Sequence, residues 1–403
     1  MTLVLAQQPG HLEQEAAPAL RLNECDETGC QTLRLDAVLD ANWRWLHAVD
    51  GYQSCFTGSS WDASICADAD ACASKCALEA VSTQKYATTY GVRALDDPRW
   101  DVELAYVTGG NVGSRLYAAS KDSYHPFRLL GKEIAFDVDL SSLPCGLNAA
   151  VYLVAADLSG ALGGGNAAGF RYGTGYADAQ CPKDLKFVRG RANLDFQASS
   201  CATEIDLFEA NSRATSFTLH PCLDQQCDRS GAGINPYREG LRDLYGPGLK
   251  VDSSRPFRVL TSFRADGDRL VEVSQRFESG GVVTEPLRVT SETIEAQASR
   301  FREKSEFDGA GGWASLTKAL RDGMVLVLSI WDDAATGMRW LDSTFPPGAS
   351  GEGATRGPCD GENPADLRSR AAAARVSFGN FTVARAVCPD GREVTHPRVH
   401  DVL

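Results

Sequence analysis

The sequence lacks the features of a membrane protein and of a nucleic-acid-binding protein. Its longest apolar runs, such as 149–156 and 325–328, stop well short of the roughly 20 residues that a membrane helix needs. Basic residues are in deficit, with 40 Lys and Arg against 53 Asp and Glu, which gives a formal net charge of −13. A polyanion is a poor partner for such a chain. We therefore expect neither a membrane nor a nucleic acid among its partners.

The chain also lacks a Pro/Ser/Thr-rich linker, an internal repeat and a shift in composition between Cys25 and Cys388. These absences leave no sign of a domain boundary between Cys25 and Cys388, so we predict one large domain over residues 20–403. Residues 1–19 form a separate N-terminal segment in this prediction. Its start, Met1–Ala6 followed by two glutamines, is typical of the end of a signal peptide without its basic beginning. A frayed or artificial start explains it equally well.

Methionine is scarce, with 3 residues, whereas cysteine is abundant, with 13. This number is high for a reduced cytosolic enzyme and favours disulfides and a secreted, extracellular protein. The cysteines between Cys55 and Cys76 superficially have zinc-like spacing, but no histidine stands among them. We expect no metal and no organic cofactor.

Strand-like alternation dominates the sequence. Residues 134, 136, 138 and 140 are apolar and alternate with Ala and Asp, which predicts a half-buried strand. Residues 257–263 and 269–277 flank Asp266-Gly267 and predict a hairpin. Residues 323–331 and 374–386 add strands, and helical spacing is limited to about 292–304 and 313–321. The sequence therefore predicts an all-β sandwich with minor helices.

Three acids stand in a stretch that otherwise suits a buried strand: Glu204, Asp206 and Glu209. The residues between them are apolar, so the opposite face must be packed and the acids must line a polar cleft. Residues two apart share a face of a strand, whereas Glu209 has the wrong parity to join the other two. A cleft with all three acids requires a bulge, or the end of the strand, near Phe208. The spacing alone also fits a solvated strand face.

Further motifs surround these acids. They follow one another as Ala-Asn-Trp-Arg-Trp (41–45), Pro-Cys-Gly-Leu-Asn (144–148), Tyr-Gly-Thr-Gly-Tyr (172–176), Asp-Ala-Gln-Cys-Pro-Lys-Asp-Leu-Lys-Phe (178–187), His-Pro-Cys (220–222), Asn-Pro-Tyr-Arg (235–238), Trp-Asp-Asp (331–333), Trp-Leu-Asp-Ser (340–343) and Arg-Gly (356–357). Together with the acids, this series resembles the signatures of glycoside hydrolase family 7, a family of cellulases. The resemblance extends from about residue 20 to residue 387.

The resemblance implies a β-jelly-roll sandwich of two antiparallel sheets with a long concave groove. It implies retaining hydrolysis of β-1,4-glucosidic bonds in cellulose or related β-glucans, with Glu204 as nucleophile, Asp206 as assisting acid and Glu209 as general acid/base. Such a mechanism needs one ionised carboxyl and one whose pKa is raised. Flat indoles suit sugar rings, and fixed polar groups suit hydroxyls. The positions that match the family's sugar-binding residues are Trp43, Trp45, Asn148, Tyr152, Tyr176, Asp178, Gln180, His220, Arg238, Trp331, Trp340 and Arg356.

The chain departs from the tunnel-forming members of the family at its loops. The loop from Phe187 to Cys201 is short, only four residues separate Cys222 from Cys227, and two alanines follow Trp331-Asp-Asp. Compared with the tunnel-forming members, the shorter loops leave the groove uncovered. We therefore predict an endo-acting enzyme that binds β-1,4-glucan and cello-oligosaccharides. Two alternatives stay open: a processive cellobiohydrolase acting from chain ends, and a lectin-like protein that binds glucan without cutting it. No carbohydrate-binding module follows the domain in this interpretation, and we expect a monomer.

The family pattern also implies a set of disulfides, which leaves Cys388 over as a free thiol or as a link to another chain. The implied pairs are Cys25 with Cys30, Cys55 with Cys76, Cys66 with Cys72, Cys145 with Cys359, Cys181 with Cys201, and Cys222 with Cys227.

Overall fold

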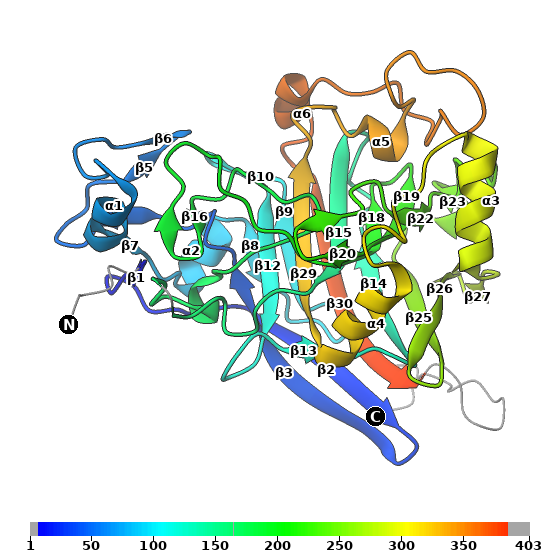
Figure 1. The fold of residues 1–403 in the computed structure, drawn as a ribbon, viewed down its shortest axis with the longest axis horizontal. Coiled ribbons are helices and arrows are strands. Elements are labelled where there is room, and N and C mark those ends of the chain that lie inside the picture. The colour runs from blue at the N-terminus through cyan, green and yellow to red at the C-terminus, as the bar shows by residue number, and fades with distance from the viewer. Residues whose placement is uncertain (1–6, 164, 386–403) are drawn as a thin grey trace.

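The computed structural model describes residues 7–163 and 165–385, and β-strands make up most of this part. Seventeen strands pair into one continuous sheet. The sheet folds into two layers because β3 (Gly29–Leu39) pairs with β12 (Ser114–Ala119) through its last residues and with β2 (Ala19–Asp26) along the rest of its length. Figure 1 shows β2 and β3 as a long hairpin that extends from the lower edge of the molecule.

The first layer, which we call the site sheet, is antiparallel and carries the three acids. From one edge inward it contains β22 (Ala232–Ile234), β19 (Thr215–His220), β18 (Glu204–Ala210), β15 (Leu147–Val154), β29 (Met324–Asp332), to which β13 (Pro126–Phe127) also pairs, and then β12.

The second layer, the back sheet, continues from β2. It contains β30 (Arg375–Arg385), β14 (Lys132–Asp139), β25 (Phe257–Asp266), β26 (Arg269–Ser279), β27 (Val282–Val283) and β28 (Leu287–Val289), with β9 (Val102–Ala105) and β8 (Val92–Ala94) joined to the start of β30.

The core lies between the two sheets and follows from the alternation of apolar side chains. Residues 147, 149, 151 and 153 of β15 point into it from one side, and residues 134, 136 and 138 of β14 from the other. Phe136, Phe208 and Phe257 make edge-on ring contacts across the interface. Each fully buried side chain of this size contributes about 1.5–3 kcal/mol. This core fixes which face of β18 turns outward.

Short elements surround the sandwich, and no helix of the described residues is long and apolar enough to cross a membrane. The helices are α1 (Ala69–Lys75), α2 (Thr83–Thr88), α3 (Ser291–Phe301), α4 (Gly312–Asp322), α5 (Arg339–Asp342), α6 (Pro364–Arg370) and the 3₁₀ turn η1 (Phe170–Tyr172). The small strands are β1 (Gln8–Pro9), β4 (Leu46–Ala48), β5 (Phe56–Thr57), β6 (Ser60–Trp61), β7 (Cys76–Leu78), β10 (Val107–Thr108), β11 (Asn111–Val112), β16 (Phe187–Val188), β17 (Arg191–Ala192), β20 (Cys222–Leu223), β21 (Gln226–Cys227), β23 (Tyr245–Gly246) and β24 (Val251–Asp252).

These elements confirm the all-β prediction and most of its details. The hairpin predicted around Asp266-Gly267 is β25 and β26, in which Asp266 pairs with Arg269 and Gly267 has the positive φ of 59° that its tight turn requires. The two predicted helices are α3 and α4. Helix α3 ends three residues earlier than expected, because Arg302 adopts a left-handed conformation directly after it.

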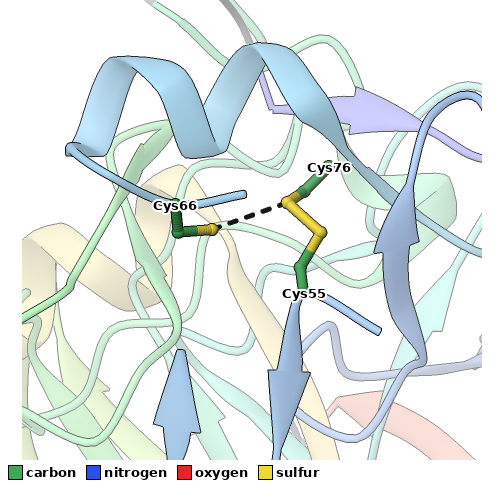
Figure 2. A group of neighbouring side chains, drawn as sticks. All are labelled: Cys55, Cys66 and Cys76. Carbon is green, nitrogen blue, oxygen red and sulfur yellow. Dashed lines mark hydrogen bonds between the residues drawn. A yellow bond between two sulfur atoms is a disulfide. The ribbon is translucent and has the colours of Figure 1, made fainter. Parts of the chain in front are cut away.

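All six cysteine pairs implied by the family pattern are disulfides in the structure. Figure 2 shows Cys55 bonded to Cys76, with the sulfur of Cys66 at 3.6 Å from that of Cys76. Cys66 itself is bonded to Cys72. These sulfurs are therefore oxidised, so the cluster offers no thiolate for the zinc that its spacing superficially suggested. Cys388 lies outside the described residues.

The described part of the N-terminal segment, residues 7–19, packs against the domain. The amide of Gly10 donates to the carbonyl of Leu78 at 2.6 Å. The carboxylate of Glu15 receives two hydrogen bonds from the buried guanidinium of Arg44, at 2.6 and 3.1 Å, and one from the hydroxyl of Tyr86 at 2.7 Å. The division at residue 19 stays a prediction, but these contacts tie the two parts together.

Candidate active site

The three acids project from one face of β18 because the strand carries a bulge. On the β15 side, Phe208 pairs with Val151 and Asp206 pairs with Tyr152, so Leu207 has no partner. The pairing with β19 shifts at the same place. Residues 205, 207 and 208 all enter the core between the sheets, and the bulge restores the outward direction at Glu209. The predicted parity change near Phe208 is confirmed.

The acids form a buried and electrostatically coupled group. Each is less than one-tenth exposed. Burial, with a further contribution from the charge of Asp206, raises the pKa of Glu209 to about 8. Burial also raises the pKa of Glu204, and the nearby carboxyls of Asp206 and Asp178 act in the same direction. The group therefore holds protons at neutral pH that isolated carboxyls would lose.

His220, on β19 next to β18, supplies positive charge to this group. Its Nε2 is 3.1 Å from an oxygen of Asp206, and its Nδ1 is 2.8 Å from the carbonyl oxygen of Asp228. Burial alone would lower the pKa of His220, but the hydrogen bond to Asp206 and its charge outweigh burial and raise this pKa to about 9. At neutral pH both ring nitrogens carry protons, and both have acceptors.

The loop at 176–180 holds Glu204 through a backbone hydrogen bond and carries further polar contacts beside it. The amide of Ala179 donates to Glu204 Oε2 at 3.0 Å. In the same loop, Asp178 accepts hydrogen bonds from the hydroxyl of Tyr176 at 2.6 Å and from the amide of Gln180 at 2.8 Å. The Tyr152 hydroxyl is 3.1 Å from that of Tyr176. The structure thus brings these four predicted residues together with the acids, although the side chain of Gln180 points to the carbonyl of Arg229.

Asn148, on β15 next to β18, is hydrogen-bonded to Glu209. Its side chain is fully buried, donates to Glu209 Oε1 at 2.9 Å and accepts from the amide of Ala210 at 3.1 Å. The hydrogen bond holds the Glu209 carboxyl in one orientation, and sugar binding by Asn148 stays a prediction. The sequence shows only an asparagine in a strand, which does not distinguish these roles.

Two of the predicted indoles line a cavity of about 640 Å³ beside β5. Trp43 donates its ring N–H to the carbonyl of Val112 at 3.2 Å, and Trp45 donates to Ser54 Oγ at 3.1 Å. Both indoles are half-buried. The guanidinium of Arg115 lies 5.3 Å from the Trp43 ring and 3.3 Å from the Tyr176 ring, so it links this cavity to the contacts around the acids.

Comparison with known proteins gives the family. A model of glycosyl hydrolase family 7 matches residues 9–385. This chain belongs to glycosyl hydrolase family 7.

Solved structures agree with the family and confirm the jelly-roll prediction. The chain is 33% identical to a cellobiohydrolase of this family from Daphnia pulex, covering 94% of this chain and 99% of that one, with a TM-score of 0.88. It is 35% identical to a cellobiohydrolase from Melanocarpus albomyces complexed with cellotetraose, covering 97% and 100%, with a TM-score of 0.86. It is 29% identical to the endocellulase EGI from Humicola insolens, covering 94% and 99%, with a TM-score of 0.80.

The remaining predicted residues of this family 7 enzyme form two further groups. The rings of Trp331 and Trp340 stack at 6.2 Å, and the Trp340 ring N–H donates to Asp333 at 3.1 Å. Arg238 and Arg356 both face Glu303, at 2.5 and 3.8 Å. Burial and the charge of Arg238 lower the pKa of Arg356 to about 10.

Sequence reasoning missed Arg115 and Glu303. Arg115 is almost buried, and its guanidinium pairs with Asp40 at 3.0 Å while stacking on two predicted sugar-binding rings. A single charged residue in the run 114–119, which otherwise suits a buried strand, is a signal that could have found it. Glu303 follows α3 on the surface and gave no comparable signal.

Proposed function

We propose that this family 7 enzyme hydrolyses β-1,4-glucosidic bonds with retention of configuration, with Glu204 as nucleophile, Asp206 as assisting acid and Glu209 as general acid/base. The observation that carries the proposal is the bulge in β18, which turns all three carboxyls to one face. The raised pKa of Glu209, about 8, supports its assignment as the proton donor.

Burial raises the pKa of both glutamates, so they compete for protons, and the form that reacts in this proposal has Glu204 ionised and the proton on Glu209. In the first step an oxygen of Glu204 attacks the anomeric carbon while Glu209 gives its proton to the departing glycosidic oxygen. The C–O bond breaks, and a glycosyl ester on Glu204 remains. In the second step, Glu209 removes a proton from water, which attacks the same carbon and releases Glu204. Asp206 stays paired with protonated His220 through both steps, so the positive charge of His220 continues to offset the negative charge of Asp206.

We propose a β-1,4-glucan such as cellulose as the substrate, bound along the groove by the indoles and polar residues named above. The cellotetraose complex of the Melanocarpus albomyces relative supports cello-oligosaccharides as ligands. Endo-action is supported by the short β20–β21 hairpin and by the exposure of Ala334 and Ala335 after Trp331-Asp-Asp. The six disulfides support secretion. We further propose one catalytic domain over residues 20–403 that acts as a monomer.

The test is hydrolysis of soluble carboxymethyl cellulose, followed by both reducing ends and viscosity. We expect wild-type enzyme to lower the viscosity rapidly and Glu204→Gln to lose activity by about 10³-fold or more, because the variant cannot form the ester. Glu285→Gln, at an exposed position, is the matched control and should retain full activity.

Reducing ends without a fall in viscosity would refute endo-action and favour a cellobiohydrolase, an alternative that the retained Trp43, Trp45 and Arg356 support. Hydrolysis that survives in Glu204→Gln would refute the assignment of the nucleophile. Wild-type enzyme that binds but does not cut any β-glucan would refute the catalytic proposal altogether.

A further inference from the structure

A glutamine interrupts an apolar row in the core between the two sheets. Gln275 stands on β26 between Val273 and Phe277, which both enter the core, and it is itself only 1% exposed. Its cross-strand partner on β25, Thr261, is equally buried. A buried amide destabilises a fold unless its donors find acceptors. The core therefore tolerates Gln275 only through the hydrogen bonds that it makes.

The side-chain nitrogen of Gln275 donates to two acceptors on different sheets. One is the hydroxyl oxygen of Thr261, at 3.1 Å on the neighbouring strand of the back sheet. The other is the carbonyl oxygen of Leu207 on β18, at 2.5 Å across the core. A carbonyl oxygen can only accept, so the nitrogen of Gln275 must face it. This bond joins the back sheet to the strand that carries the acids.

Leu207 is the extra residue of the bulge in β18. It has no partner on β15, and the pairing with β19 omits it as well. In a regular strand the carbonyl groups lie in the plane of the sheet and bond to neighbouring strands. The Leu207 carbonyl instead meets a side chain of the opposite sheet, so the bulge turns it out of that plane and into the core. Leu207 is fully buried, so Gln275 supplies there the donor that solvent cannot.

The bulge affects the three acids unequally. Glu204 and Asp206 precede it and are two residues apart, so they share a face in any regular strand. Glu209 follows it and reaches that face only because of the extra residue. Asn148 holds the carboxyl of Glu209, but the direction of the whole side chain depends on the backbone at Leu207. A contact that fixes this backbone therefore fixes the direction of Glu209.

We propose that Gln275 is a positioning residue for Glu209, because its hydrogen bond to the Leu207 carbonyl stabilises the bulge that directs Glu209 toward the glycosidic oxygen. The inference rests on the proposed function for the role of Glu209 as proton donor. Gln275 lies between the sheets, so it acts through the backbone of β18 and not on the substrate. Its loss weakens proton donation by Glu209 and leaves the attack by Glu204 intact.

The test compares two substrates that differ in their need for a proton. The leaving group of dinitrophenyl β-cellobioside departs without protonation, whereas that of phenyl β-cellobioside depends on acid catalysis. For both, kcat/KM reports the step in which the leaving group departs. Gln275→Met keeps nearly the same volume and has no N–H donor. We expect it to lower kcat/KM about 10-fold for the phenyl substrate and less than about 2-fold for the dinitrophenyl substrate.

The ratio of the two kcat/KM values does not depend on the fraction of enzyme that is folded, so a partly unfolded sample still gives an answer. Thr261→Val is the matched control, because it removes the other acceptor of Gln275 in the same buried pair. It should lower the denaturant midpoint, as Gln275→Met does, and leave the ratio unchanged. Gln275→Glu keeps the size of the side chain and, protonated through burial at about pH 5, keeps one donor for Leu207. Its ratio should return to within about 2-fold of wild type at that pH.

Glu209→Gln separates failure of this proposal from failure of the proposed function. It cannot give a proton, so its ratio should change by about 10²-fold or more. If it does so while the ratio in Gln275→Met stays at the wild-type value, Gln275 does not position Glu209 and the proposal is overturned. If Glu209→Gln leaves the ratio unchanged, or wild-type enzyme cleaves neither substrate, the proposed function is wrong and the positioning role is overturned with it.

Discussion

Replacing His220 by glutamine tests the electrostatics of the site through protein stability. The folded pKa of His220 is raised to about 9 from its ordinary 6.5, because Asp206 and the carbonyl of Asp228 accept its two protons. This difference is worth about 3.4 kcal/mol at about 1.36 kcal/mol per pH unit. A raised folded pKa stabilises the protein fully below pH 6.5, and the stabilisation is lost as the pH rises through 9.

The measurement is urea unfolding with disulfides intact at about pH 6 and about pH 10. Both proteins carry Glu209→Gln, because Glu209, with its pKa of about 8, would otherwise titrate in the same window. We expect the free energy lost on His220→Gln to be about 3 kcal/mol larger at the lower pH. Glutamine can still donate to Asp206, so the comparison isolates the proton.

His125→Gln is the control for this experiment. Burial lowers the pKa of His125 below 6.5, so its titration lies below the window that His220 occupies. Measured at about pH 7 and about pH 10, above the pKa of His125 in both states, its stability difference should be the same at both values. If the difference for His220→Gln were equally flat, His220 would not be charged in the folded protein. The assigned pairing with Asp206 would then be refuted.

Two further predictions concern stability elsewhere in the fold. Burial raises the pKa of Asp342 to about 6 from 3.8, while Gly146 and Asn211 both donate to its Oδ2. The ionised form is disfavoured, so Asp342→Asn should gain up to about 3 kcal/mol on wild type between pH 4 and 7 in urea unfolding, and a flat difference would contradict this. Removal of the Cys145–Cys359 disulfide, which spans 214 residues, should cost about 3 kcal/mol more than removal of Cys222–Cys227, which spans 5. Denaturant midpoints of the two double-alanine variants check this, and equal losses would refute the loop-entropy argument.

The sequence predicts those parts of the fold that local alternation determines. Strands such as β14 are readable because one face enters the core and the other carries charge, as Phe136 and Asp137 do. The bulge in β18 is readable as well, because three acids with mixed parity cannot share a face of a regular strand. The disulfides were implied by the family pattern, since connectivity cannot be deduced from cysteine spacing alone.

Contacts between distant segments were beyond sequence reasoning. Asn148 and Glu209 are 61 residues apart, and only the register between β15 and β18 reveals that their side chains are hydrogen-bonded. The sequence likewise does not reveal that Arg115 on β12 pairs with Asp40, which directly follows β3. For Gln275, the sequence gives a polar residue in an otherwise apolar row, while the carbonyl that it bonds across the core is 68 residues away.

Strand β18, which carries the three acids, is buried along its whole length. Burying several ionised carboxyls together would cost more free energy than the core could offset, so the group must hold protons or find a counter-charge. His220 supplies the counter-charge, and burial raises the pKa of Glu209 to about 8, which favours a proton there at neutral pH. The same protonated carboxyl is what acid catalysis requires. Under the proposed function, the destabilisation of the fold by its buried acids and the capacity of Glu209 to protonate a leaving oxygen have one physical cause, and a variant that removes the first should also remove the second.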